Sequence, residues 1–367
     1  MNVLSKYLNQ RNSHFIDDCP LLENILLKID RDTPTVLFGA SEGGRGIYDI
    51  LIKKGVSVDY FCDNNQEKWG SNYLDTPVIS PTKLKLLNHP DILITSSYQS
   101  EINAQLNKMK LGNVYHFPLI DIISEKHYDI NFHLNHKADI SLTGNLFEEE
   151  KSKSVYENLI KYRLEKNLHY IKNIRTDDMY IPKIILKMLN ANSIIFDIGA
   201  FNGDSTESFL HHFTNIHKII AFEPEINNYE KLKKKFANDK RVLPQNKIIS
   251  NRVKTFYMSN DGAESKVTTN KTGDSQEINA ISIDRFCKEH DIFPNYIKMD
   301  VEGFERQVLI GAEFIIKKYK PLLAVSVYHI ASDLWTIPKL ILSLNNNYNF
   351  QLRHHSYNIC DSVLYCY

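Results

Sequence analysis

The chain has 367 residues, which is more than one ordinary hydrophobic core usually holds, so we expect two domains. Apolar residues make up 43% of the sequence and charged residues 24%, which is typical of a soluble globular protein and excludes a disordered one. The 44 basic and 44 acidic residues cancel, so no overall field indicates nucleic acid or an anionic membrane as a partner.

The five cysteines are scattered and form no Cys-x-x-Cys pair. This pattern favours reduced thiols over a disulfide framework or a structural zinc site. The N-terminus lacks a signal-peptide pattern, and no apolar run reaches the ~18 residues that a membrane span requires. We therefore expect a cytoplasmic protein with no membrane span, and the sequence leaves its oligomeric state open.

Residues 1–125 are predicted to form an N-terminal Rossmann-like α/β module. Residues 1–32 have the spacing of a helical lead-in, and Thr35–Phe38 is a strand that runs into a turn rich in glycine. Further strands are expected at 56–61, 91–96 and 113–117, with a helix at 102–109 between the last two. The glycines Gly39, Gly43 and Gly46 depart from the Gly-x-Gly-x-x-Gly dinucleotide fingerprint, so a ligand at this turn is only weakly indicated.

This module resembles the Rossmann-like domains that accompany sugar-modifying enzymes in surface-polysaccharide pathways. The resemblance covers residues 34–120 and rests on three short stretches: Phe38-Gly39-Ala40, Asp63-Asn64 with Lys68-Trp69-Gly70, and Pro77-Val78-Ile79-Ser80-Pro81.

Residues 126–190 are predicted to be a linker followed by a helical segment. Residues 124–150 are polar and mixed, as in a linker, whereas apolar residues recur at helical spacing from Tyr156 to Ile171. A further helix, 183–189, leads into the second domain, which we place at residues 191–367.

The most informative stretch runs from Ser193 to Thr206. A short apolar run typical of a buried strand ends at Asp197, and Gly199 and Gly203 bracket a tight turn before a helical pattern. A glycine-rich turn between a strand and a helix lets backbone N–H groups approach a ligand closely. The next strand ends in Glu223-Pro224, and an acidic residue about 20 positions beyond such glycines is what a ribose diol needs as an acceptor.

Further strands follow, and two of them end in residues that can do chemistry. A strand at 295–299 runs into Asp300, Glu302 and Glu305, and a strand at 321–327 ends in Tyr328-His329. Asp284 is expected to be the N-cap of a helix at 285–290. Residues 350–355 and 362–367 are spaced as an antiparallel hairpin, and 259–265 is expected to be a polar loop.

Together these motifs resemble the FkbM family of S-adenosylmethionine-dependent methyltransferases, over roughly residue 180 to the C-terminus. The matching stretches, in order, are Asp197-x-Gly199-Ala200-x-x-Gly203-Asp204-x-Thr206, Glu223-Pro224, Asp284-Arg285-Phe286, and Ile297-Lys298-Met299-Asp300-Val301-Glu302-Gly303-x-Glu305. The resemblance implies a class I methyltransferase fold, a seven-stranded mixed sheet with helices on both faces. It also implies O-methylation with S-adenosyl-L-methionine as cofactor, commonly of a sugar hydroxyl.

The residues suit those roles. The glycine turn would pack against the methionine part of the cofactor, Glu223 would accept from both ribose hydroxyls, and Asp197 would favour the sulfonium cation. Tyr180, just ahead of the domain, is either a ring covering the cofactor or a core tyrosine. The full set of candidate cofactor-binding residues is Asp197, Gly199, Ala200, Phe201, Gly203, Asp204, Ser205, Thr206, Glu223, Pro224 and Tyr180.

His329 is the candidate base, since it follows a strand where open α/β sheets place ligands, and since an ordinary histidine pKa suits proton acceptance at neutral pH. Asp300 and Glu302 compete for that role, and Asp333 is a candidate to orient His329 or to bind a sugar hydroxyl. Arg353, His354 and His355 are further candidates to line an acceptor pocket. Oxygen ligands at 300–305 are dense enough to hold Mg²⁺, but acidic groups are also favoured where a helix opens, so the sequence favours a metal-free site.

Two other functions stay open at this stage. A nicotinamide-dependent oxidoreductase acting on nucleotide-sugars would use the N-terminal module, although its glycine spacing is incomplete and it lacks a Tyr-x-x-x-Lys pair. Alternatively, that module is a non-catalytic domain that binds the acceptor. The acceptor itself, a small molecule or a glycan, is not identified by any residue pattern.

Overall fold

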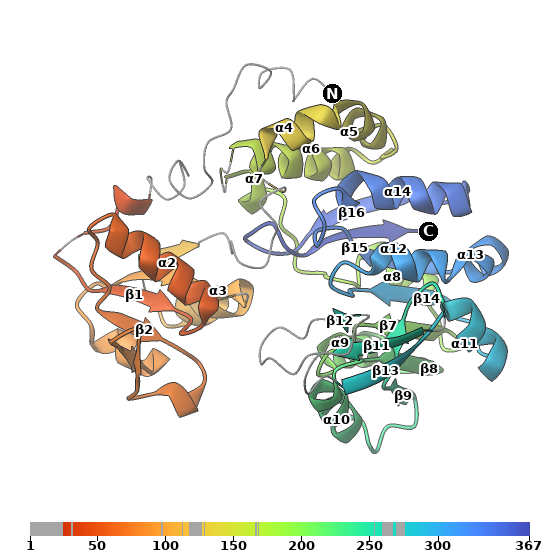
Figure 1. Ribbon diagram of the computed structural model, residues 1–367, viewed down its shortest axis with the longest axis horizontal. Helices are drawn as coiled ribbons and strands as arrows, with labels where there is room; N and C mark the ends of the chain where they lie inside the picture. The colour runs from red at the N-terminus through yellow and green to blue at the C-terminus, as the bar shows by residue number, and fades with distance from the viewer. Residues whose placement is uncertain are drawn as a thin grey trace. The chain divides into compact units, whose positions relative to one another are not determined.

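A computed structural model of the chain describes residues 25–30, 32–96, 98–111, 113–116, 127, 129–165, 167, 169–252, 254–258, 267–268 and 276–367. The chain divides into two compact units, and Figure 1 labels many of their helices and strands. The first comprises Met1–Gly144, Ser154–Thr176 and His354–Asp361, and the second comprises Asn145–Lys153, Asp177–Arg353 and Ser362–Tyr367. Most of the expected helical lead-in, and the expected loop at 259–265, lie outside the described residues.

The first unit contains a six-stranded sheet in the order β3-β4-β2-β1-β5-β6. All neighbours pair in parallel except β3 and β4. The strands are β1 (Thr35–Phe38), β2 (Tyr60–Cys62), β3 (Asn72–Tyr73), β4 (Thr76–Ile79), β5 (Asp91–Ile94) and β6 (Val114–His116). The connecting helices are α2 (Glu42–Lys53), η2 (Gln66–Lys68), η3 (Pro81–Leu86) and α3 (Gln99–Lys108).

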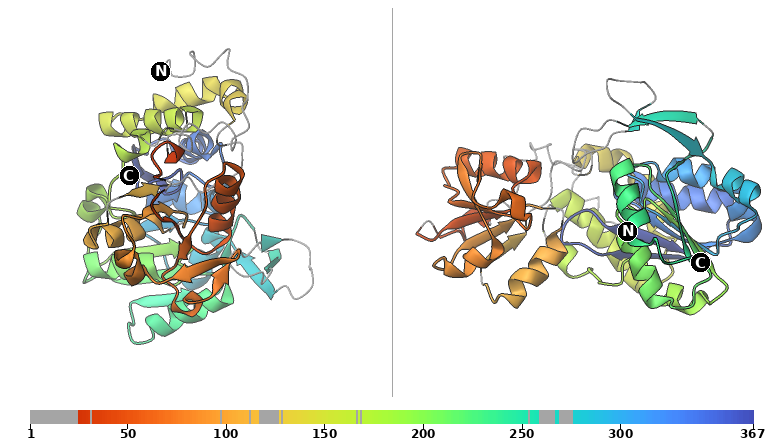
Figure 2. Two further views of the ribbon diagram at one scale, coloured as in Figure 1. Left: turned by 90° about the vertical axis from the view of Figure 1, so that its left-hand side faces the viewer. Right: turned by 90° about the horizontal axis from the view of Figure 1, so that it is seen from below.

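Alternating side chains of this sheet pack against helices on its two faces. Leu37 and Leu93 form one cluster with Leu51 of α2, whereas Val36 and Ile92, one position earlier on the same strands, join Leu106 of α3. Successive strand residues point to opposite faces, so an apolar strand of this kind needs cover on both sides. The right-hand view of Figure 2 shows α2 and α3 on the two sides of the sheet.

The polar stretch that we expected to be a linker contains two helices instead. The helices of this part of the chain are α4 (Ile130–Asn135), α5 (Lys137–Gly144), α6 (Glu150–Glu165) and α7 (His169–Lys172). Asp129 caps α4, since its side chain accepts a hydrogen bond from the Phe132 N–H at 3.1 Å. Ile130 of α4 and Ile140 of α5 are buried, whereas Leu142 is exposed, so the apolar face of these helices is narrow.

The second unit is built on a seven-stranded mixed sheet in the order β16-β17-β15-β14-β7-β8-β9, which confirms the predicted fold class. Only β17 is shown antiparallel to its neighbour β15, and strands β15 through β9 are parallel. The strands are β7 (Ile194–Ile198), β8 (Lys218–Phe222), β9 (Val242–Gln245), β14 (Tyr296–Met299), β15 (Leu322–Ser326), β16 (Phe350–His354) and β17 (Ser362–Cys366). Reciprocal backbone hydrogen bonds of 2.9 and 3.1 Å join Asn349 and Tyr367 at the ends of β16 and β17, so the predicted C-terminal hairpin is confirmed.

Helices and a small sheet accompany the seven strands (Figure 1). The helices are α8 (Lys183–Met188), α9 (Asp204–His212), α10 (Ile226–Lys235), α11 (Ile283–His290), α12 (Glu305–Ile310), α13 (Glu313–Tyr319) and α14 (Asp333–Leu344). The small sheet, in the order β10-β13-β11-β12, consists of β10 (Ile248–Ile249), β11 (Lys254–Met258), β12 (Val267–Thr268) and β13 (Gln276–Ile281). None of the helices in the described ranges has the length and apolar content of a membrane span.

Asp284 does not cap α11 as expected. Ser282 is the N-cap, since its hydroxyl accepts from the Arg285 N–H at 3.2 Å. The Asp284 carboxylate accepts instead from the N–H groups of Phe314 and Ile315 at 2.9 and 3.0 Å. It satisfies free donors at the start of α13, a helix that is distant in the sequence.

The register of the sheet brings the predicted motifs to one edge. Ile198 pairs with Phe222 on β8 and with Met299 on β14, and Met299 pairs with Val325 on β15. Because these strands are parallel, the residues that follow them meet at the carboxyl edge of the sheet, where open α/β folds place their ligands.

Candidate active site

The turn after β7 depends on its glycines. Gly199 and Gly203 have φ angles of +76° and +92°. A Cβ atom on residue 199 would lie 1.8 Å from the carbonyl oxygen of Asp300, and one on residue 203 would lie 2.5 Å from the Phe236 ring. Only glycine fits the backbone conformation and the close approach of the neighbouring strand.

Phe201, in the middle of this turn, has a φ of +50° and a side chain that is 45% exposed. A bulky residue seldom adopts a left-handed conformation, and such strain is concentrated at sites that bind ligands. By contrast, the neighbouring Ala200 is buried against Leu232 and Phe236. The turn thus exposes one aromatic ring and buries the small side chain beside it.

Asp197 supports the turn from inside the protein. It has no exposed surface, and its Oδ2 accepts hydrogen bonds from the hydroxyls of Ser205 and Thr206, each at 2.7 Å. Its Oδ1 lies 3.2 Å from Nζ of Lys298, which also donates to the carbonyl oxygen of Gly199 at 2.5 Å. Because its charge is paired with Lys298, this geometry does not support the direct attraction to a sulfonium that we expected of Asp197.

Glu223 follows β8 and reaches back to the glycine turn. Its Oε2 accepts from the Phe201 N–H at 2.8 Å, and its Oε1 accepts from the Glu225 N–H at 2.9 Å. The residue is only 6% exposed, and burial raises the pKa of Glu223 to about 7 in spite of these two donors and the field of Lys298. A carboxylate in this state gains from further hydrogen-bond donors, which is what ribose hydroxyls provide.

Two other predicted residues of this turn face different surroundings. The side chain of Asp204, the first residue of α9, is 68% exposed and lies 3.4 Å from Nζ of Lys235. Pro224 is held through its carbonyl oxygen, which accepts from Nδ2 of Asn246 at 2.9 Å. Asp204 therefore lies at the end of the glycine turn, and Pro224 lies beside Glu223.

Tyr180 is fixed by three hydrogen bonds in a strained backbone conformation with a φ of +63°. Its N–H donates to the Tyr365 hydroxyl at 2.8 Å, and its carbonyl oxygen accepts from the Tyr296 hydroxyl at 2.6 Å. Its own hydroxyl donates to Oδ2 of Asp300 at 2.8 Å, and Nζ of Lys298 lies 5.1 Å from the ring centroid. This buried hydrogen-bond network stabilises the strained conformation, so Tyr180 is held in a fixed position at the carboxyl edge of the sheet.

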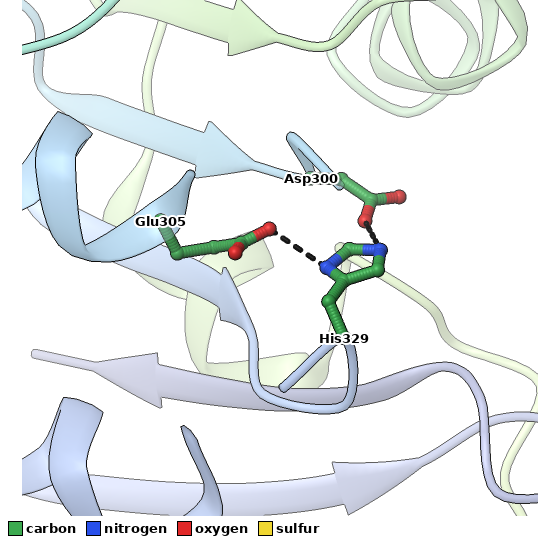
Figure 3. Close-up of side chains that lie close together, drawn as sticks. All are labelled: Asp300, Glu305 and His329. Atoms are coloured by element: carbon green, nitrogen blue, oxygen red, sulfur yellow. Dashed lines mark hydrogen bonds and ion pairs between the residues drawn. The ribbon is translucent and has the colours of Figure 1, made fainter. Parts of the chain in front are cut away.

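Asp300, Glu302 and Glu305 surround the imidazole of His329, as Figure 3 shows for two of these carboxylates. Nδ1 of His329 is hydrogen-bonded to Oε1 of Glu305 at 2.8 Å. Nε2 lies 3.5 Å from Oδ1 of Asp300 and 3.3 Å from Oε2 of Glu302. The three expected catalytic residues therefore lie together.

The charges in this cluster shift the pKa of its members. Burial alone would lower the pKa of His329, but Glu305, Asp300 and Glu302 outweigh it and raise the pKa to about 10. Burial alone would raise the pKa of Asp300, yet Lys298, His329 and hydroxyl donors hold it below the ordinary value. His329 is consequently protonated at neutral pH in this state, which corrects our expectation of a histidine with an ordinary pKa.

The structure gives other partners to the remaining candidates. Oδ2 of Asp333 accepts from the Ile330 N–H at 3.1 Å, and Glu305 is the residue that orients His329. Arg353 forms a two-pronged ion pair with Glu149, both nitrogen–oxygen distances being 2.8 Å, and it is only 6% exposed. His354 and His355 are buried, and burial lowers the pKa of His354 to about 3. These contacts favour internal roles over an acceptor pocket.

Sequence reasoning gave no role to Lys298 and no orienting role to Glu305. The signal for Lys298 was present, since a lysine inside an apolar strand needs an acidic partner. The signal for Glu305 was weaker, because its contact with His329 requires knowing that α12 begins beside the end of β15.

The glycine turn of the first unit is closed by its own side chains. Oδ2 of Asp63 accepts from the Ala40 N–H at 3.0 Å, and Nζ of Lys68 lies 2.9 Å from the same oxygen. Lys68 also donates to the carbonyl oxygen of Ala40 at 2.8 Å. The position at which a ribose would meet an acidic residue is thus taken up by a lysine.

Two family models match parts of the chain. Residues 197–352 match the model described as Methyltransferase FkbM domain, and residues 32–114 match the model described as C2185-like, N-terminal. No curated protein matches the chain.

Solved structures of methyltransferases are similar to this chain. Methyltransferase FkbM from Methylobacillus flagellatus KT has 18% sequence identity and a TM-score of 0.66, over 100% of this chain and 97% of that chain. A putative rRNA-methylase from Clostridium thermocellum has 10% identity and a TM-score of 0.30, over 55% and 92% of the two chains. Fibrillarin from Aeropyrum pernix, in complex with natively bound S-adenosyl-L-methionine, has 12% identity and a TM-score of 0.30, over 49% and 68%.

The last two likenesses are too weak to carry an argument, whereas the first shows a shared fold. The carboxyl edge that carries Glu223, Asp300 and His329 lies within the segment that matches the FkbM methyltransferase domain.

Proposed function

We propose that this protein is an S-adenosylmethionine-dependent O-methyltransferase that methylates a hydroxyl of a sugar or glycan. The observation that carries the proposal is the meeting of three features at one sheet edge. These are the glycine turn at 199–203, the buried Glu223 carboxylate bonded to that turn, and the cluster of Asp300 and His329. The match of residues 197–352 to the FkbM methyltransferase domain supports it.

The residues around the turn fit the cofactor. Gly199 and Gly203 shape the turn through their left-handed φ angles and let Asp300 and Phe236 pack against it, and the backbone of Ala200 and Phe201 lies in the same turn. The buried Glu223 carboxylate would accept from the ribose hydroxyls, beside Pro224. S-adenosylmethionine, when bound, supplies a methyl group on a positively charged sulfur.

A second set of residues would hold the turn in shape. Asp197, Ser205 and Thr206 bind one another beneath the turn, and Lys298 ties Asp197 to the Gly199 carbonyl. Asp204 opens the helix that follows, where free N–H groups favour negative charge. Such support matters because methyl transfer depends on an in-line approach of oxygen to carbon, which positioning supplies.

Asp300, Glu302 and His329 would receive the acceptor hydroxyl. Tyr180 holds one oxygen of Asp300, and Glu305 holds the ring of His329, so both groups are fixed before an acceptor arrives. His329 already holds a proton in this state, so one of the carboxylates that face it would take up the proton that the hydroxyl releases.

The N-terminal unit is proposed to be a non-catalytic module that binds the acceptor. Asp63 is the acidic residue that a nicotinamide nucleotide would need, and it is already paired with Lys68. This pairing disfavours the oxidoreductase alternative. Reduction of NAD by the protein with any nucleotide-sugar would reverse this assignment.

The test combines binding with a substrate screen. Calorimetry should show one S-adenosylhomocysteine bound per chain, and mass spectrometry should find nucleotide-sugars or polysaccharide fragments that gain one methyl group when S-adenosylmethionine is present. The matched control is Glu230→Gln, which changes an exposed residue of α10 and should leave binding and transfer unchanged. A wild-type protein that binds neither form of the cofactor would contradict the proposal.

A further inference from the structure

The imidazole of His329 is buried with one of its nitrogens unsatisfied. The side chain is only 6% exposed, and Nε2 has no hydrogen-bond partner among the described residues. A buried polar atom left without a partner costs about 1–3 kcal/mol, so its retention calls for a reason. Nε2 faces Asp300 and Glu302, and Figure 3 shows the first of these.

The distances around Nε2 suit ligands of one ion better than hydrogen bonds. Oδ1 of Asp300 and Oε2 of Glu302 lie 3.5 and 3.3 Å from Nε2, beyond the ~2.7–3.2 Å typical of an N–H···O bond. Two ligands that each bind a cation at about 2.1 Å lie roughly 3.0–3.4 Å apart, from right-angled to tetrahedral geometry. The ligand atoms of Asp300, Glu305 and His329 lie within 4.8 Å of one another, and the exposed side chain of Glu302 would turn to join Asp300 and His329 around an ion.

The other nitrogen of His329 is arranged as in a metal-binding histidine. Nδ1 is bonded to the Glu305 carboxylate at 2.8 Å, which favours the tautomer with its proton on Nδ1 and leaves the Nε2 lone pair for an ion. Glu305 is itself held by the Val301 N–H at 3.0 Å, and it is only 1% exposed. A buried carboxylate behind the imidazole is the usual outer support of a metal ligand.

The oxygen ligands are positioned in different ways. Oδ2 of Asp300 accepts from the Tyr180 hydroxyl at 2.8 Å, while Oδ1, which faces His329, accepts from the Tyr328 hydroxyl at 3.3 Å. Glu302 has a φ of +51° and a side chain that is 83% exposed, so it borders the cluster on an open side. Its carboxylate faces His329, and Glu305 is turned to the same ring.

We propose that Asp300, Glu302 and His329 bind a divalent cation, with Glu305 as the positioning residue of His329. One imidazole and two carboxylates suit a first-row ion such as Mn²⁺, and three protein ligands leave positions for water and an acceptor hydroxyl. Without the ion, a proton occupies the same place between the carboxylates. The role of the ion in transfer rests on the proposed function: it would hold the hydroxyl oxygen and ease the loss of its proton.

Binding of Mn²⁺ to the full chain, freed of metal by a chelator, tests the site without reference to activity. We expect about one Mn²⁺ per chain by electron paramagnetic resonance, with affinity reduced at least tenfold in Asp300→Asn and in Glu302→Gln. Loss of an outer support typically costs about 10–100-fold in metal affinity, so Glu305→Gln should also bind more weakly. Glu230→Gln, remote from the cluster on α10, is the matched control and should bind as the wild type does.

Several outcomes would overturn the site. Glu302 is exposed, so Glu302→Gln should fold normally, and an Mn²⁺ affinity equal to that of the wild type would remove it as a ligand. A wild-type chain that binds Mn²⁺ no better than Asp300→Asn would remove the site altogether. Full methyl transfer by chelated protein would overturn the role of the ion in catalysis. Calorimetry with S-adenosylhomocysteine on the metal-depleted chain tests the proposed function separately, because the residues proposed to bind the cofactor differ from those proposed to bind the ion.

Discussion

The six-stranded and the seven-stranded sheets of this chain share one arrangement around their first parallel strands. In the first sheet, β1 leads into the turn at Gly39, and Asp63 after β2 accepts from the Ala40 N–H at 3.0 Å. In the seven-stranded sheet, β7 leads into the turn at Gly199, and Glu223 after β8 accepts from the Phe201 N–H at 2.8 Å. In both, an acidic residue at the end of the second strand closes the glycine turn that follows the first.

The two sheets differ in what neutralises that acidic residue. Asp63 has Nζ of Lys68 at 2.9 Å, and the same lysine donates to the Ala40 carbonyl. Within the described ranges, Glu223 has no cation at ion-pair distance, and burial raises its pKa to about 7. A turn that carries its own counter-ion is complete without a ligand, whereas a turn with an uncompensated buried carboxylate gains from the donors that a ligand brings.

Replacing Gly199 in the second unit should destabilise the protein more than replacing Gly55 in the first, because only the turn at Gly199 is closely packed. Gly199 and Gly55 have nearly the same φ, +76° and +75°, but a Cβ at 199 would meet Asp300 at 1.8 Å and a Cβ at 55 would meet nothing within 4 Å. We expect Gly55→Ala to cost about 1–2 kcal/mol from backbone conformation alone. Gly199→Ala should cost more than about 4 kcal/mol, because strands β7 and β14 must separate.

Hydrogen exchange measures this difference strand by strand, which suits a chain of two units better than one melting curve. Protection should fall in β7 and β14 for Gly199→Ala and stay at the wild-type level there for Gly55→Ala. Equal effects of the two substitutions on β7 would show that the close approach of Asp300 is relieved without cost.

Removing an acidic partner should affect the two sheets unequally. Asp197→Ala leaves Lys298 buried without its counter-ion, and loss of one partner of a buried pair costs about 3–5 kcal/mol. Asp63→Ala leaves Lys68, whose side chain is 38% exposed, in contact with water, so we expect a cost of about 1 kcal/mol. Unfolding in urea, followed by hydrogen exchange in each sheet, compares the two.

The double variant Asp197→Ala with Lys298→Met is the control for the buried pair. It removes both charges and should recover part of the stability lost in Asp197→Ala. A double variant less stable than Asp197→Ala would show that Lys298 acts mainly through its bond to the Gly199 carbonyl.

Neutralising Glu223 and Asp63 should distinguish a carboxylate that binds the cofactor from one that only stabilises its turn. Glu223→Gln loses the charge that receives the ribose hydroxyls, and hydrogen bonds to charged groups contribute about 1.5–3 kcal/mol, so S-adenosylhomocysteine should bind at least about tenfold more weakly. Asp63→Asn should leave this affinity unchanged. Calorimetry on both variants decides, and a loss of affinity in Asp63→Asn alone would move the cofactor to the first sheet.

The residues at the carboxyl edge of the seven-stranded sheet could be predicted because each is marked by a local sequence pattern. The apolar run before Asp197, the glycines after it, and Glu223 at the end of the next strand all follow from strand and turn chemistry. Parallel pairing then places these residues together without further information, and the antiparallel hairpin at the C-terminus was equally local.

The errors arose where a partner is distant in the sequence or where composition conceals burial. Asp284 was assigned to the nearest helix, but it satisfies the N–H groups of Phe314 and Ile315. The pKa of His329 depends on three carboxylates gathered by a strand end and a helix start, so an ordinary value could not hold. Helices α4 and α5 were overlooked because both are short and lie in a stretch of polar and mixed composition.

The smallest predicted effect is a pH dependence that belongs to Glu223 alone. Because its pKa is about 7, the group is mostly ionised at pH 8 and mostly protonated at pH 6, and the ionised form is the better acceptor for ribose hydroxyls. Affinity for S-adenosylhomocysteine should therefore fall about tenfold from pH 8 to pH 6. Glu223→Gln has no such group and should lack this part of the slope.

The stability of the ligand-free protein should change in the opposite direction. The pKa of Glu223 is raised above the value of 4.5 that applies when the chain is unfolded, so folding favours the protonated form. This stabilisation is complete below pH 4.5 and is lost as the pH rises through about 7. The difference in stability between wild type and Glu223→Gln, measured by urea unfolding at several pH values, isolates it from other groups. A wild type whose ligand affinity and stability both rise with pH relative to Glu223→Gln would show that the buried carboxylate is compensated, as Asp63 is by Lys68.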